Sequence, residues 1–242
     1  MAGLLYKDFV AIKGKLYVAL MFAILGLALA VRMFVPAMYI DGPLWAVCLM
    51  VTLLFYFVVV GKLELSLIAA DEGRKQNQYY LSLPVSRKQY VASKYLFLLL
   101  TFWAILSFSA LLQTICLFNC ENEVIQQMIL LVNGLLPSLT CGFMILPTVE
   151  LPFFVGIGTK RGSQVKTGLV IALFFLIIVY LFFGDLTILD RINFMAILNY
   201  LKGHPSLLLV LQVLAPYGVM LLYYLSYRIS CKLFAKRGWE ND

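Results

Sequence analysis

Residues 16–38 have the sequence LYVALMFAILGLALAVRMFVPAM, an almost unbroken apolar run that contains one charge, at Arg32. A helix of about 20 such residues crosses the roughly 30 Å of hydrocarbon in a bilayer. Five further runs follow, so we expect six membrane-spanning helices, at 16–38, 43–63, 95–118, 127–149, 167–184 and 206–227. The sequence therefore predicts an all-α, polytopic membrane protein.

The composition supports the same class. Of the 242 residues, 63% are hydrophobic and 13% are charged, with a mean hydropathy of +0.94. Soluble domains are roughly 45–50% apolar and about 25% charged, so a water-soluble globule, a disordered chain and a coiled coil are excluded. The runs do not alternate as the strands of an outer-membrane barrel would. The first run lacks the features of a cleavable signal peptide and is expected to be the first span.

The basic residues predict the orientation. Of the 19 lysines and arginines, all but Arg32, Arg191 and Lys202 fall at the N-terminus, after the second and fourth runs, or in the C-terminal tail. Such residues stay on the cytoplasmic side, so both termini are expected to be cytoplasmic. Attraction to anionic headgroups and this topology account for the net charge of +7 without a nucleic-acid partner.

The first 15 residues predict an amphipathic helix in the inner interface. Its apolar positions recur at helical spacing, whereas charged residues occupy the other positions. The apolar positions are Leu5, Phe9, Ile12 and Leu16, and the charged ones are Lys7, Asp8, Lys13 and Lys15. Two interpretations stay open: an ordinary anchor for the first span, or an elbow helix that sets the position of the protein in the leaflet.

Residues 64–94, between the second and third runs, carry the densest mixture of charged and turn residues. Pro84 disfavours helix at Leu83, and Ser86 with Gln89 forms a capping box. A new helix is therefore expected to begin at Ser86 and to continue into the third span. A loop of this design can transmit a push from a cytoplasmic partner into the second and third spans. On the outer side, residues 185–205 predict a short interfacial helix or a re-entrant segment.

The motifs of an enzyme are missing from the sequence. No G-x-x-x-x-G-K-[ST] phosphate loop occurs, and Gly156–Gly162 has the wrong spacing for dinucleotide binding, which favours a basic inner turn. A single histidine, His204, cannot supply a zinc site of two histidines. Asp71 and Glu72 are adjacent and cannot face one point on a helix, so they are expected to face a partner. The five scattered cysteines are expected to be packing residues.

Glu150 is the candidate charged residue of the inner vestibule. We expect Pro147 and Pro152 to break the helix around it, and Glu150 to pair with Lys160 or Arg161. The alternative is an interfacial carboxylate at a helix end. In the same run, Asn133 and Ser138 lie among small and helix-bending residues. Such residues favour an interface between helices or between two copies of the chain, and pore lining stays open.

Several short stretches resemble a known family. They are LLYKDF at residues 4–9, Asp71 with Glu72, LSLPVSR at residues 81–87 and SKYL at residues 93–96. These stretches resemble the small ABC-2 type permease subunits of Gram-positive bacteria, and within that group the permeases of phenol-soluble modulin exporters and related peptide exporters.

The resemblance implies a single transmembrane domain over residues 1–242 without its own motor. Such subunits pair, as two copies or two paralogues, with two separate ATP-binding subunits that hold ATP and magnesium, and this chain would bind no cofactor or metal. The implied setting is a bacterial plasma membrane, and the implied substrate is an amphipathic or antimicrobial-type peptide. A lipid or drug exporter and a non-transporting scaffold or sensor are the alternatives. The implied contacts to the ATP-binding subunit are Asp71, Glu72, Arg74, Lys75, Gln76, Tyr79, Tyr80, Pro84, Ser86 and Arg87.

Overall fold

The computed structural model describes residues 2–35, 37–69, 86–118, 120–183, 203–204, 206 and 209–236, and the regular structure in this part of the chain is helical. The all-α prediction is confirmed. The elements are α1 (Ala2–Ala11), α2 (Gly14–Phe34), α3 (Ala37–Val58), the π-helix η1 (Val59–Leu63), α4 (Glu64–Ala69), α6 (Arg87–Leu117), α7 (Glu123–Ile157), α8 (Thr159–Phe183), the π-helix η2 (Val210–Leu214) and α12 (Ala215–Lys236).

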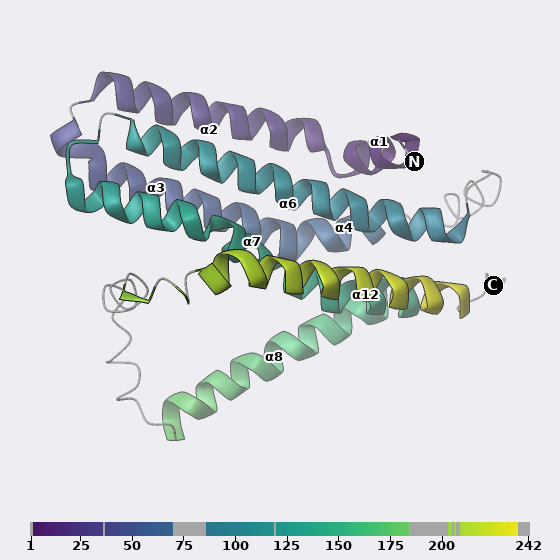
Figure 1. Ribbon diagram of the computed structural model, residues 1–242. Helices are drawn as coiled ribbons and strands as arrows, with labels where there is room; N and C mark the ends of the chain where they lie inside the picture. Colours follow the sequence, from purple (N-terminus) through teal and green to yellow (C-terminus); the bar gives the residue numbers. More distant parts are fainter. Residues whose placement is uncertain are drawn as a thin grey trace.

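Long helices lie side by side in a bundle. Figure 1 shows α2, α3, α6 and the first part of α7 running along one another, with α12 beside the second part of α7 and α8 leading away. The core lies between α3, α6 and α7, where Tyr56 stacks on Phe143 with ring centroids 4.9 Å apart. The Tyr56 hydroxyl lies 2.6 Å from Thr140 Oγ1, so this buried phenol is hydrogen-bonded as burial requires.

Within the described residues, four helices are long and apolar enough to cross a membrane: Gly14–Phe34, Gly42–Ala69, Lys88–Leu117 and Glu123–Ile157. They coincide with the first four predicted spans. The positions predicted for the fifth and sixth spans overlap α8 and α12. The count of six and the orientation of the termini stay predictions.

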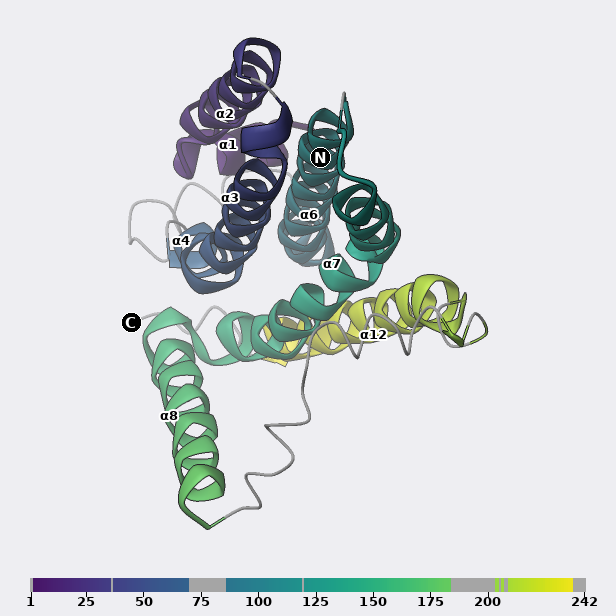
Figure 2. The same ribbon diagram turned by 90° about the vertical axis from the view of Figure 1, so that its left-hand side faces the viewer.

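The helix-breaking effect predicted for Pro147 and Pro152 is wrong. Both residues lie inside α7, a continuous helix of 35 residues that also contains Pro137. Proline at position 152 cannot donate to the carbonyl of Thr148, four residues earlier. Ser226 of α12 donates to that carbonyl instead, at 2.5 Å. A neighbouring helix therefore satisfies the backbone group that proline leaves free, and α7 changes direction without ending (Figure 2).

The helix at the N-terminus is shorter than the single helix predicted for the first 15 residues. The α1 helix ends at Ala11, Lys13 adopts a left-handed conformation with φ of 56°, and α2 begins at Gly14. A Cβ atom on Gly14 would lie 2.3 Å from the Phe9 ring, so the close turn requires glycine there. Because the turn changes the helix axis, Leu16 belongs to α2 and is exposed. The role of α1 as an elbow stays a prediction.

The start of α6 is confirmed as predicted. Ser86 is the N-cap, its backbone N–H donates to Gln89 Oε1 at 2.9 Å, and its side chain accepts from the Gln89 backbone at 3.3 Å. Residues 70–85, which precede this cap and hold most of the predicted partner contacts, lie outside the described residues.

Candidate functional site

One end of the bundle brings together the elements that flank residues 70–85. Figure 1 shows α1, the end of α4, the start of α6 and the end of α12 at this end. Among the described residues, most of the basic residues that predicted the cytoplasmic side belong to these elements and to the α7–α8 corner. Two ion pairs lie among them, a buried one centred on Lys94 and a partly buried one centred on Glu150.

Lys94 joins three elements. Its Nζ lies 2.6 Å from Asp8 Oδ1 of α1 and 3.4 Å from the Leu67 carbonyl oxygen of α4. The side chains of Lys94 and Asp8 are only 1% and 2% exposed. A charge so well removed from water persists only with a partner, so the pair fixes α1 to α6. It also ties the last helix before residues 70–85 to the first helix after them.

The next residue, Tyr95, joins α6 to α12 and α7. Its hydroxyl lies 2.7 Å from both Ser226 Oγ and Ser230 Oγ. Because Ser226 donates its hydrogen to the Thr148 carbonyl, Tyr95 donates to Ser226 and accepts from Ser230. The Tyr223 hydroxyl donates to the Tyr95 carbonyl at 2.7 Å. A displacement of the first turns of α6 would therefore be transmitted to the bend of α7.

Glu150 forms the second ion pair, with Lys166. Glu150 Oε2 lies 2.6 Å from Lys166 Nζ, and Lys166 also donates to the Val60 carbonyl at 2.7 Å. Val60 lies in the π-helix η1, whose shifted hydrogen-bond register is typical of functional positions. This contact joins α7 and α8 to the inner end of the second predicted span.

The predicted partners of Glu150, Lys160 and Arg161, are wrong because the corner between α7 and α8 is tight. Gly158 forms it with φ of 98°, and a Cβ atom on Gly162 would lie 2.5 Å from the Phe154 ring. Glu150 lies two turns before the end of α7, and Lys166 lies two turns after the start of α8. Residues at similar distances from a tight corner face each other, whereas Lys160 and Arg161 lie at the corner itself.

The other predicted site residues are distributed along the chain. Ser86 caps α6, Arg87 is its first residue, and Asp71 to Pro84 lie outside the described residues. Asn133 and Ser138 are half-buried on α7. Beside them, a Cβ atom on Gly134 would lie 2.9 Å from Gln212 Nε2 of η2, and further along one on Gly156 would lie 3.2 Å from Leu233 of α12. The small residues of α7 thus let α12 approach closely within this chain.

Sequence reasoning missed Asp8, Lys94 and Lys166. Asp8 was placed on the polar face of the N-terminal helix, yet it is buried, and the two lysines were counted only as topological charges. For the two lysines the available signal was a charge directly before an apolar run, since such a charge needs a partner when packing removes it from water. Which charges pair depends on tertiary contacts and could not be read from spacing.

The far end of the bundle has its own polar contacts. Arg32 is buried, and its Nε donates to the carbonyl of Phe118, which joins the end of α2 to the end of α6. Trp45 donates to Gln113 Oε1 at 3.0 Å. The described residues contain no group of three or more His, Cys, Asp or Glu side chains placed to hold a metal ion.

Comparison with known proteins identifies the family. A family model described as ABC-2 family transporter protein matches residues 3–235, nearly the whole chain. No curated protein and no solved structure matches the chain. With its apolar helices and its match over almost the full length, this chain belongs to the ABC-2 family of transporter proteins.

Proposed function

We propose that this chain is the permease subunit of an ATP-driven exporter in a bacterial plasma membrane. Two copies, or one copy and a paralogue, would associate with two copies of a separate ATP-binding subunit that carries ATP and magnesium. The subunit would dock on residues 64–94, and amphipathic or antimicrobial-type peptides would be moved outward. The family match supports a transport role. The resemblance of the short stretches to peptide-exporter permeases supports the substrate class.

The observation that carries this proposal is the Lys94 contact. Residues 70–85 run between the end of α4 and the cap of α6, and Lys94 joins these two helices to each other and to α1. Tyr95 extends the connection to α12 and to the bend of α7. A force applied by a docked ATP-binding subunit on residues 70–85 would move these elements together rather than deform one loop.

A second permease copy is supported by α8. It packs against α7 and α4 at its start and then leads away from the bundle (Figure 1). An apolar helix that leads away from its own bundle offers a surface on which a second copy can pack, as permease dimers require. Asn133 and Ser138 remain candidates for lining a path or an interface between the copies.

The decisive experiment is co-expression with the ATP-binding subunit encoded beside this chain. Replacing Asp71, Glu72, Arg74 and Lys75 by alanine should abolish co-purification of that subunit, whereas the control Glu121→Ala with Glu123→Ala, at the other end of the bundle, should not. Hydrolysis by the reconstituted complex should rise when an amphipathic peptide is added. Stimulation by a lipid or drug instead would replace the peptide substrate, and failure of any ATP-binding subunit to bind would favour a scaffold or sensor.

A further inference from the structure

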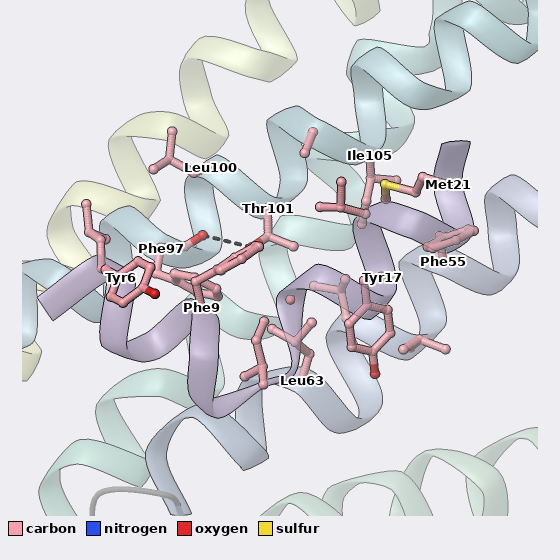
Figure 3. Close-up of a pocket in the computed structure, with 17 residues that line it drawn as sticks. Tyr6, Phe9, Tyr17, Met21, Phe55, Leu63, Phe97, Leu100, Thr101 and Ile105 are labelled. Carbon is pink, nitrogen blue, oxygen red and sulfur yellow. Dashed lines mark hydrogen bonds between the residues drawn. The ribbon is translucent and has the colours of Figure 1, made fainter. Parts of the chain in front are cut away.

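An apolar cavity of about 500 Å³ lies beside the N-terminal turn, between α1, α2, α3 and α6. Figure 3 shows Phe9 of α1, Tyr17 and Met21 of α2, Phe55 of α3 and Ile105 of α6 around it. Its volume lies within the range of sites that bind small molecules. Thr101, one of its few polar residues, already donates to the Phe97 carbonyl at 2.9 Å, so the lining offers little to a polar ligand.

The cavity opens where the protein is expected to meet lipid. The α2 helix, which forms one wall, is only 11% buried over its most apolar window, and Leu16 and Phe22 on it are 62% and 70% exposed. Within a membrane such a surface contacts acyl chains, because nothing else in the described residues covers it. An occupant that enters from this side is therefore apolar.

The turn that borders the cavity is basic. Lys13 lies between two lining residues, Ile12 and Gly14, and Lys15 follows directly. Both lysines are exposed, and neither has an ion pair within the described part of the chain. The carboxylate of Asp8, on the neighbouring helix α1, is buried and held by Lys94. The electrostatic potential beside this turn therefore favours an anion at the level of the inner headgroups.

We propose that the cavity binds one anionic phospholipid of the inner leaflet, with an acyl chain between α1 and α6 and the headgroup on Lys13 and Lys15. The apolar lining accounts for the chain, and the two lysines account for the headgroup. Leu5 and Phe9 line the cavity from the same helix that carries Asp8. The lipid thus fills the space beneath α1 and supports the contact between Asp8 and Lys94.

Native mass spectrometry of the purified full-length chain, titrated with phosphatidylglycerol or phosphatidylcholine, tests the site. The wild type should hold one phosphatidylglycerol per chain, with phosphatidylcholine roughly 25-fold weaker if each lysine contributes about fivefold. Ala104→Trp, which places an indole in the lining, should lower phosphatidylglycerol retention at least to the level of phosphatidylcholine. Ser107→Trp is the matched control, because Ser107 is exposed on the same helix outside the lining.

The headgroup contact has a separate test that spares the packing. Lys13→Gln with Lys15→Gln should reduce the preference for phosphatidylglycerol to near unity, whereas Lys160→Gln with Arg161→Gln, equally exposed at the α7–α8 corner, should leave it unchanged. Equal retention by Ala104→Trp and Ser107→Trp would overturn the proposal. So would equal binding of the two lipids by the wild type, or a retained mass that matches a peptide or a second copy of the chain. Because the readout is lipid mass, the result does not depend on transport or on the ATP-binding subunit.

Discussion

Asp8 and Lys94 carry opposite charges at 2.6 Å in a site that water does not reach. Removing one partner leaves the other as an uncompensated buried charge, which typically costs about 3–5 kcal/mol. We therefore expect Lys94→Met to lower the thermal stability of the detergent-solubilised protein strongly, and the double variant Asp8→Leu with Lys94→Met to recover most of the loss. Lys88→Met is the control, because Lys88 is exposed on the same helix. Equal losses in the single and double variants would show that the lysine acts through packing rather than through the pair.

Glu150 gives a second prediction at this scale. Glu150→Gln removes the carboxylate from Lys166 but leaves the Val60 carbonyl as an acceptor, so the expected loss is smaller, about 2 kcal/mol. We also expect ATP-driven transport to fall, since the contact holds the α7–α8 corner against η1. Lys160→Gln, at the exposed corner, should change neither quantity. Normal transport and assembly in Glu150→Gln would leave Glu150 as an ordinary interfacial carboxylate.

At the scale of elements, local signals were enough for some boundaries and not for others. The capping box of Ser86 and Gln89 involves only residues three apart, so the start of α6 could be predicted from the sequence. The continuity of α7 through Pro152 could not be predicted in this way. It depends on a hydrogen bond from Ser226 to the Thr148 carbonyl, and these two residues are 78 positions apart in the sequence. The turn at Lys13 was missed because a lysine adopts the left-handed conformation there. Such a position is usually occupied by glycine or asparagine, which mark the turn in a sequence.

The bend of α7 leads to a prediction on Pro152. Ser226→Ala leaves the Thr148 carbonyl without a donor and removes one of the two hydroxyl partners of Tyr95, which should cost about 1–3 kcal/mol in thermal unfolding experiments. Pro152→Ala restores a backbone N–H that can donate to Thr148, so Ser226→Ala should cost less in that background. Ser107→Ala, an exposed serine on α6, is the control for removing a hydroxyl. Additive losses from Ser226→Ala and Pro152→Ala would mean that the serine does not compensate for the proline.

For the whole molecule, hydropathy was sufficient for the class and for the positions of the first four long helices. The family match confirms the ABC-2 family that the short stretches in the first 96 residues indicated. The arrangement of the helices could not be inferred, because apolar helices in lipid have no hydrophobic preference for one partner over another. The buried pairs of Lys94 and Glu150 and the close contacts of Gly134 and Gly156 provide that specificity.

The predicted number of six spans depends on whether α8 crosses the membrane. If α8 crosses the membrane, its start at Lys160 is cytoplasmic and His204 beyond its end is outside. In a chain with its five native cysteines replaced, Glu121→Cys and His204→Cys should then react with an impermeant maleimide added to intact cells. Lys160→Cys and Lys232→Cys should react only after permeabilisation, because positive charge retains these segments inside. Labelling of Glu121→Cys but protection of His204→Cys would mean that α8 returns to the inner face, which removes the six-span topology while leaving the first four spans unchanged.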